Sequence, residues 1–268
     1  THGTDEANIE YFNAGMDSTI LQGAQLSGGS RAVELGLITL KGTKSLANIM
    51  FILGLVTAAG ILYMSYLNTG STSNAYNSAI IALIGVLVGY FYTAKPIRLS
   101  SRYGLGELSI FLSFGPLLTL GTGFAIANET ILLYSNEFYN LLLLGVPIGL
   151  LTTNILFINQ YPDHASDKIS GKNHLVVLLG KKASRWIYAL NLVLTLGSLY
   201  FIAENVLSGT KQMLFLYMLI PISMFYSYFL LSGLFKYYNS RKLIKYNIHT
   251  IYFHMFFSFI YMIILANF

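Results

Sequence analysis

The side chains best suited to chemistry lie in one polar segment, which reads NQYPDHASDKISGKNHLVVLLGKK. Within it Asn159, Asp163 and Asp167 are spaced four residues apart, so that on a continuous helix they would share one face. Magnesium prefers oxygen ligands and usually binds one or two carboxylates together with phosphate oxygens and waters. With Lys168 and Lys172 just beyond, the spacing suits a magnesium-bridged diphosphate.

Pro162 gives the same segment a plainer interpretation. A proline at this point predicts a kink or a new helix start, and an aspartate near a helix N-terminus often serves only as its cap. The segment would then be a hydrophilic loop with one capping aspartate and several solvated lysines. Because two aspartates four residues apart are common by chance, the spacing alone leaves both interpretations open.

The elements that must position these side chains are long apolar runs. The chain of 268 residues is 54% hydrophobic, 15% aromatic and 10% charged, whereas soluble domains carry about 25% charged residues. Lipid must therefore solvate part of the chain, which requires helical runs of about 20 apolar residues. The period-2 alternation of a β-barrel is absent, so we predict an all-α, polytopic membrane helical bundle. We expect seven spans, at about 46–67, 77–94, 105–127, 138–159, 184–204, 212–233 and 249–267.

Lysine and arginine residues are confined to alternate connections between these spans. Of the 16 basic residues, all but Lys211 fall within 1–45, 95–104, 160–185 and 234–248. The positive-inside rule places these segments in the cytoplasm, and we expect an integral protein of the cell inner membrane. The net charge of +5 then lies along a membrane face, which favours the lipid bilayer or a phosphorylated substrate as partner over nucleic acid. No feature of the sequence indicates an obligate protein partner.

A second polar segment on this face, residues 1–45, is longer than a simple connector. Its SGGSR stretch is suited to form a backbone nest that holds an anion beside Arg31. A flexible linker with an isolated arginine is the alternative. The amphipathic pattern from Arg31 to Leu40 predicts a short helix on the membrane surface.

The third polar segment reads YFYTAKPIRLSSRYGLGELSIF. Pro96 ends the preceding helix and gathers Lys95, Arg98 and Arg102 at the membrane face. Such a cluster by itself is typical of a topology signal. Glu107 lies just inside a span, where an unpaired carboxylate is costly, so we expect Arg98 or Arg102 to be its partner.

These segments match a known family. The stretch NQYPDHASDKISGKNHLVVLLG resembles the second aspartate-rich motif of the UbiA superfamily of intramembrane aromatic prenyltransferases. The stretch YTAKPIRLSSRYGLGELSIFLSFGPL is similar to a segment of the branch that prenylates 1,4-dihydroxy-2-naphthoate for menaquinone, and GTDEAN followed by SGGSR is similar to the stretch after the first aspartate motif. The matching positions are Asn159, Asp163, Asp167, Gly171, Lys172 and Gly180, with Tyr92, Thr93, Pro96, Arg98, Leu99, Gly104, Gly106, Glu107, Gly115 and Pro116.

The resemblance implies transfer of a polyprenyl group from polyprenyl diphosphate to an aromatic acceptor. It implies that Asp163, Asp167 and Asp5 hold Mg²⁺, and that Asn159 orients a metal ligand or a diphosphate oxygen. Tyr92 could stabilise the allylic cation through its ring face. The residues expected to contact the diphosphate are Lys95, Arg98, Lys168, Lys172 and, with the SGGS turn, Arg31.

The chain departs from the family pattern in two places. The family has nine spans, and its first aspartate motif follows the second of them, whereas this sequence begins at Thr1 with Asp5 close behind. We therefore expect 1–268 to be a single UbiA-like domain without its first two helices, and 1–45 to be the cytoplasmic loop after the first motif. At 173–174 the chain has Asn-His where relatives often have a basic residue and Thr, a difference we expect to leave the metal ligands untouched.

Other functions remain open at this stage. A different UbiA-type acceptor, such as 4-hydroxybenzoate, homogentisate, a tetrapyrrole or a glycerol phosphate, would use the same diphosphate site. A transporter is the alternative from another class. Transporters usually place polar residues and broken helices near the middle of the membrane, whereas the polar residues here gather at one face, which favours the enzyme.

Overall fold

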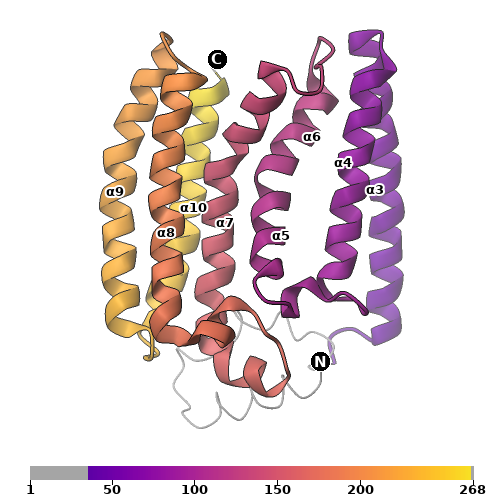
Figure 1. Ribbon diagram of the computed structural model, residues 1–268. Helices are drawn as coiled ribbons and strands as arrows, with labels where there is room; N and C mark the ends of the chain where they lie inside the picture. Colours follow the sequence, from indigo (N-terminus) through magenta and orange to yellow (C-terminus); the bar gives the residue numbers. More distant parts are fainter. Residues whose placement is uncertain (1–35, 267–268) are drawn as a thin grey trace.

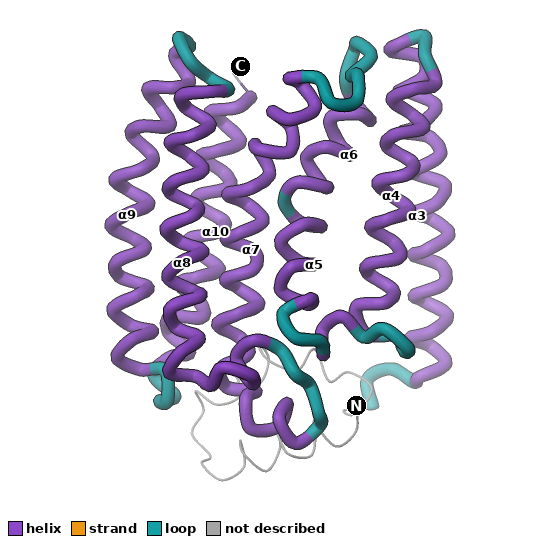
Figure 2. Tube along the Cα trace, viewed as in Figure 1, coloured by secondary structure: helices purple, strands orange, loops and turns teal. Residues whose placement is uncertain are grey.

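The computed structural model describes residues 36–266, and its long elements are all helices (Figures 1 and 2). Seven helical stretches are long and apolar enough to cross a membrane, which confirms the prediction of an all-α bundle with seven spans. In chain order the helices are α3 (Leu40–Thr69), α4 (Thr72–Thr93), α5 (Leu105–Phe114), α6 (Pro116–Ile126), α7 (Asn136–Ile169), α8 (Leu175–Asn205), α9 (Lys211–Tyr237) and α10 (Leu243–Ala266). The pair α5 and α6 forms one of the seven stretches.

Short polar side chains fix where several helices begin. Thr39, Ser71, Ser135 and Thr210 each accept a hydrogen bond from a backbone N–H in the first turn of the helix that follows. Such caps satisfy groups that have no partner inside the helix. At the other end of α3, Gly70 adopts a left-handed conformation with φ 64°, which closes the helix and lets the chain reverse.

The connections lie at two opposite ends of the bundle, as Figure 1 shows. Residues 94–104, 170–174 and 238–242 connect helices at one end, and residues 127–135 and 206–210 connect them at the other. The first of these ends carries the lysine and arginine clusters of the sequence and is called the basic end below. The alternation of charge along the sequence therefore corresponds to the path of the chain.

Helix α7 joins the two parts of the bundle. It packs against α8 and α10 on one side and against α5 and α6 on the other. Half of its apolar stretch is buried, compared with none of that of α3. Because α7 runs from the far end to the basic end, its last turns are held by neighbours from both parts.

Polar side chains link α7, α8 and α10 inside the apolar region. The Asn191 side chain donates to Oδ1 of Asn154 at 2.9 Å, and the Asn154 amide donates to the carbonyl of Tyr188 at 3.2 Å. The hydroxyls of Tyr188 and Thr250 lie 2.8 Å apart. In lipid a polar group must find its partner inside the protein, so these bonds fix the register of the three helices.

The span expected at 105–127 is broken in two. At Gly115 the chain leaves the helical conformation, with φ −116° and ψ −107°, and Pro116 begins α6. The break lies against two glycines of α7. A Cβ atom on Gly115 would lie 2.7 Å from the carbonyl oxygen of Gly145, and one on Gly149 would lie 2.5 Å from that of Phe111. Hydrogen in place of a side chain is what lets the backbones approach this closely.

The new helix start that Pro162 also predicted is wrong, because α7 continues through this proline to Ile169. Ile158 and Tyr161 are fully buried before the proline, and Ser166 and Asp167 are buried after it. Packing on both sides of the proline therefore keeps this stretch helical although the proline ring cannot donate a backbone hydrogen bond.

The expected surface helix from Arg31 to Leu40 can be compared with the structure only from residue 36 onward, and there it is not supported. Residues 36–39 form a turn and bend, with Gly36 at φ 70°, and the helix α3 begins only at Leu40. The remainder of that segment, including Arg31, lies outside the described residues, as does Asp5.

We predict that Gly149→Ala destabilises the protein by about 1–3 kcal/mol, because the added methyl meets backbone atoms of α5 that have no room to move. Thermal unfolding of the detergent-solubilised protein measures this as a lower Tm. Gly197→Ala is the matched control, since a Cβ on Gly197 of α8 meets no atom within 4 Å and alanine favours the helix. Equal Tm values for the two variants would contradict the close packing of α7 on the broken span.

Candidate functional site

Two loops that are far apart in the sequence meet at the basic end. The N–H of Tyr103 donates to the carbonyl of Asn173 at 2.8 Å, and the N–H of Asn173 donates to that of Ser101 at 3.2 Å. These bonds join the loop 94–104 to the loop 170–174, which follows α7. The first and third polar segments of the sequence, which contain Asn173 and Tyr103, are thus parts of one structure.

The buried side chain of Glu107 fastens the same assembly from inside. Glu107 is 4% exposed, and its Oε1 accepts hydrogen bonds from the Gln160 side chain at 3.1 Å and from the N–H of Leu175 at 2.9 Å. Glu107 lies in the first turn of α5, Gln160 belongs to α7 and Leu175 begins α8. One carboxylate oxygen therefore ties three helices together directly behind the two loops.

The expected ion pair between Glu107 and Arg98 or Arg102 is wrong. The Arg102 guanidinium donates instead to the backbone carbonyls of Pro96 at 2.8 Å and Ile97 at 2.7 Å, which closes its own loop. Glu107 takes neutral donors from α7 and α8 in its place. This arrangement gives Oε1 of Glu107 two donors without burying a cation beside it, which would itself carry a desolvation cost.

Asp167 is the most constrained of the predicted metal ligands. It is 6% exposed, its Oδ1 lies 2.6 Å from Nζ of Lys172, and its Oδ2 lies 3.1 Å from Nε2 of His174. Gly171, at φ 73°, turns the chain so that both partners come back onto α7. The expectation that the Asn-His pair would not affect the metal ligands is therefore wrong, because His174 contacts Asp167 directly.

Asp163 and Asn159 precede Asp167 by one and two turns of the continuous helix α7. Asp163 is half-buried and lies within electrostatic range of Lys181 on α8. Oδ1 of Asn159 accepts a hydrogen bond of 3.2 Å from the Asn247 side chain on α10. Oxygen-bearing side chains thus follow one another along the part of α7 that approaches the basic end.

The remaining predicted residues lie at the same end of the bundle. Lys168 is exposed on the last turn of α7, and Tyr92 on the last turn of α4 lies within electrostatic range of Glu107. Arg98 is half-buried with φ 48°, directly before the 3-10 turn η1 (Leu99–Ser101), and Lys95 is exposed. Of the predicted cations, Lys172 is the one that the described structure brings onto Asp167.

Sequence reasoning missed three contributors to this site. It read His174 as a harmless departure, counted Lys181 only toward the charge of its loop, and gave Asn247 no role. Helical periodicity relates residues of one helix, whereas these three reach Asp167, Asp163 and Asn159 from outside α7. A buried polar residue in an apolar span was the one available signal for Asn247, which is 3% exposed.

The donor set fits a hard divalent cation that is completed by other oxygen ligands. Asp163, Asp167 and Asn159 offer oxygens alone, as magnesium prefers. Between residues 36 and 266 no group of three or more His, Cys, Asp or Glu side chains forms a complete metal site. Two carboxylates and an amide are a ligand set that magnesium can bind together with phosphate oxygens and waters.

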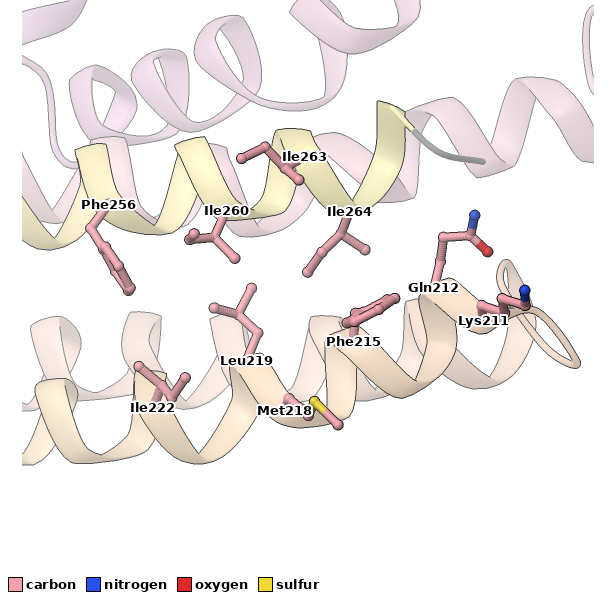
Figure 3. A pocket seen from close by; sticks show the side chains of 10 residues that line it. All are labelled: Lys211, Gln212, Phe215, Met218, Leu219, Ile222, Phe256, Ile260, Ile263 and Ile264. Atoms are coloured by element: carbon pink, nitrogen blue, oxygen red, sulfur yellow. The ribbon is translucent and has the colours of Figure 1, made fainter.

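A cavity lies between α9 and α10, away from the polar residues described above (Figure 3). Its volume is about 580 Å³, and Figure 3 shows side chains such as Phe215, Leu219, Ile260 and Ile264 between the two helices. Lys211, one of the residues that line the cavity, begins α9 at the end of the bundle opposite the basic end. Because no carboxylate is among its lining residues, this cavity offers no carboxylate ligand for a metal and is not the candidate site.

Comparison with known proteins gives consistent matches. The pattern of the UbiA prenyltransferase family matches residues 30–260. A 2-carboxy-1,4-naphthoquinone phytyltransferase of Synechocystis sp. is 31% identical over 172 residues, which are 62% of this chain and 49% of the relative. The 1,4-dihydroxy-2-naphthoate octaprenyltransferase of Escherichia coli is 33% identical over 124 residues, which are 46% of this chain and 37% of the relative. The chain thus spans about half the length of the first relative and less of the second, and no solved structure matches.

We predict that Glu107→Ala destabilises the protein by about 1–3 kcal/mol, because it leaves the N–H of Leu175 and the Gln160 amide buried without their acceptor. Thermal unfolding in detergent measures the loss. Glu107→Gln is the matched control, since it keeps an acceptor oxygen of the same reach and is expected to lose less. If the alanine variant unfolds at the wild-type temperature, the carboxylate does not fasten the three helices.

Proposed function

Because the chain belongs to the UbiA prenyltransferase family, we propose that the protein transfers a polyprenyl group from polyprenyl diphosphate to an aromatic acceptor. The observation that carries this proposal is the arrangement at the end of α7. There Asn159, Asp163 and Asp167 occupy successive turns of one helix, and a lysine of the following loop lies on the last of them. This combination of oxygen ligands and cations suits a diphosphate bound with a divalent cation.

Asp163 and Asp167 would hold the Mg²⁺, with Asn159 directing its amide oxygen or nitrogen toward a ligand or a diphosphate oxygen. When bound, the cation neutralises the negative charge that develops on the departing diphosphate. The first aspartate motif would contribute Asp5, which lies outside the described residues.

The basic residues would stabilise the same charge from the protein side. Lys172 already lies in the site on Asp167, and its side chain is 34% exposed, so it can turn toward a phosphate oxygen. Lys168, Lys95 and Arg98 lie at the same end, and Arg31, outside the described residues, would add a further contact. Fixed cations of this kind favour departure of the diphosphate because they need little rearrangement as its charge grows.

The apolar part of the donor requires a different environment. Loss of diphosphate leaves an allylic cation, which water would capture before the acceptor could react. The ring of Tyr92, at the end of α4 and near the loop 94–104, could stabilise such a cation through its face. The polyprenyl tail would lie between apolar helices and reach the bilayer, which suits a reaction between membrane-dissolved partners.

For the acceptor we propose 1,4-dihydroxy-2-naphthoate, in menaquinone biosynthesis. The names of the Escherichia coli and Bacillus subtilis relatives state this acceptor, and the Synechocystis relative is named for a carboxynaphthoquinone. By the positive-inside rule the basic end, with both aspartate segments, would face the cytoplasm of the cell inner membrane. A soluble, charged acceptor would then reach the site from the cytoplasm, and a lipid-soluble product would leave into the bilayer.

We predict that the natural protein, with Mg²⁺, a polyprenyl diphosphate and 1,4-dihydroxy-2-naphthoate, releases diphosphate and forms a prenylated product. Asp163→Ala and Asp167→Ala should each lower the rate by about 100-fold or more, since each removes a ligand of the cation that neutralises the leaving group. Enzymatic detection of diphosphate and mass spectrometry of the product measure both steps.

Glu129→Ala is the control for these variants, because Glu129 is an exposed acid at the end opposite the site and its loss should leave the rate unchanged. Full activity after combined replacement of Asp163 and Asp167 would contradict the assignment of the site. A preference for 4-hydroxybenzoate over the naphthoate would leave the site intact and correct the acceptor.

A further inference from the structure

We propose that His174 is a positioning residue that holds the Asp167 carboxylate in a fixed orientation for the divalent cation. This inference rests on the proposed function of the α7 site. It concerns a contact between two elements, since Asp167 lies in the last turn of α7 and His174 immediately precedes α8. The family resemblance predicted no such contact, because relatives often have threonine at this position.

Both ring nitrogens of His174 are engaged. Nδ1 accepts a hydrogen bond from the N–H of Val177 at 3.4 Å, as the N-cap of α8, and Nε2 lies 3.1 Å from Oδ2 of Asp167. A nitrogen that accepts a bond carries no hydrogen, so the hydrogen of the neutral ring resides on the other nitrogen. Nε2 is therefore the donor to Asp167. The cap at Nδ1 determines the tautomer of the ring, and so ensures that Asp167 meets the nitrogen that carries the hydrogen.

The two partners of Asp167 differ in how firmly they are held. The side chain of His174 is 2% exposed, whereas that of Lys172 is 34% exposed on a flexible aliphatic stem. Lys172 can leave Oδ1 for a phosphate oxygen when substrate arrives. His174 has no comparable freedom, because its ring is fixed by the helix it caps and by its burial.

Because of this difference, the two oxygens of the Asp167 carboxylate have separate roles. Oδ2 stays fixed by His174, and Oδ1 becomes available when Lys172 moves away. A carboxylate fixed at one oxygen loses little rotational freedom when its other oxygen binds a cation. Groups that orient a metal ligand in this way commonly contribute about 10-fold to 100-fold in metal affinity.

Capping of α8 alone would also explain a histidine at position 174, so the test must separate the two roles. His174→Asn keeps a good helix cap, because asparagine is among the best N-cap residues, but its short side chain does not reach Asp167. His174→Gln has an amide that extends as far as Nε2 and can donate to Asp167, but glutamine is a poor cap. Each variant therefore removes one role and keeps the other.

The test uses the natural protein in detergent with Mn²⁺ as the probe and inorganic diphosphate as co-ligand. Electron paramagnetic resonance gives the Mn²⁺ affinity, thermal unfolding without metal gives the Tm, and diphosphate release at increasing Mg²⁺ gives the concentration for half-maximal rate. For His174→Asn we expect an unchanged Tm, Mn²⁺ affinity weakened about 10-fold, and a matching rise in the Mg²⁺ requirement. For His174→Gln we expect a lower Tm and Mn²⁺ affinity close to that of wild type.

Two results would overturn the inference alone. Wild-type Mn²⁺ affinity in His174→Asn would show that the contact does not orient Asp167. An affinity that falls with the Tm in His174→Gln, but not in His174→Asn, would show that the ring acts only as a helix cap. If the wild-type protein binds no Mn²⁺ with diphosphate and releases no diphosphate, the proposed function and this inference both fail.

Discussion

Glu107 is buried just inside a membrane span, where its carboxylate must be satisfied by groups of the protein itself. Its Oε1 accepts hydrogen bonds from Gln160 of α7 and from Leu175 at the start of α8, and these bonds tie both helices to α5. The two basic loops then meet edge to edge through backbone bonds at Asn173. Because the loops carry the cations and α7 carries the carboxylates, this one constraint brings the two halves of the candidate site together.

The glycines of α5 and α7 make the same constraint possible. Glu107 can reach α7 only if the broken span lies close to it, and Gly115, Gly145 and Gly149 allow the backbones to touch. Further along α7, the polar pairs Asn154–Asn191 and Asn159–Asn247 fix its register against α8 and α10. The helix that presents the site is thus held on both sides over most of its length.

At the site, basic side chains lie close to both aspartates of α7. Asp167 is paired with Lys172 and bonded to His174, and Lys181 lies within electrostatic range of Asp163. An excess of basic groups around two carboxylates favours a ligand that brings both negative charge and a divalent cation. A magnesium diphosphate has this composition, and its arrival would exchange lysine–carboxylate contacts for lysine–phosphate and metal–carboxylate contacts.

The sequence predicted those features that depend on local patterns. Apolar runs located the seven spans, the charge of successive loops located the basic end, and four-residue spacing offered one shared helix for Asn159, Asp163 and Asp167 as one of two interpretations. It did not predict features that depend on packing between distant segments. Burial on both sides keeps α7 helical through Pro162, Gly115 breaks a span because α7 lies against it, and Glu107 takes neutral donors from two other helices.

The central claim is that the end of α7 binds a divalent cation together with diphosphate. Anomalous diffraction from Mn²⁺ tests it most directly, in crystals of the natural protein grown with an unreactive polyprenyl thiodiphosphate. We predict an anomalous peak in direct coordination with the carboxylates of Asp163 and Asp167, bridging to the diphosphate. A diphosphate bound elsewhere in the protein, or a Mn²⁺ peak that contacts neither aspartate, would contradict the account.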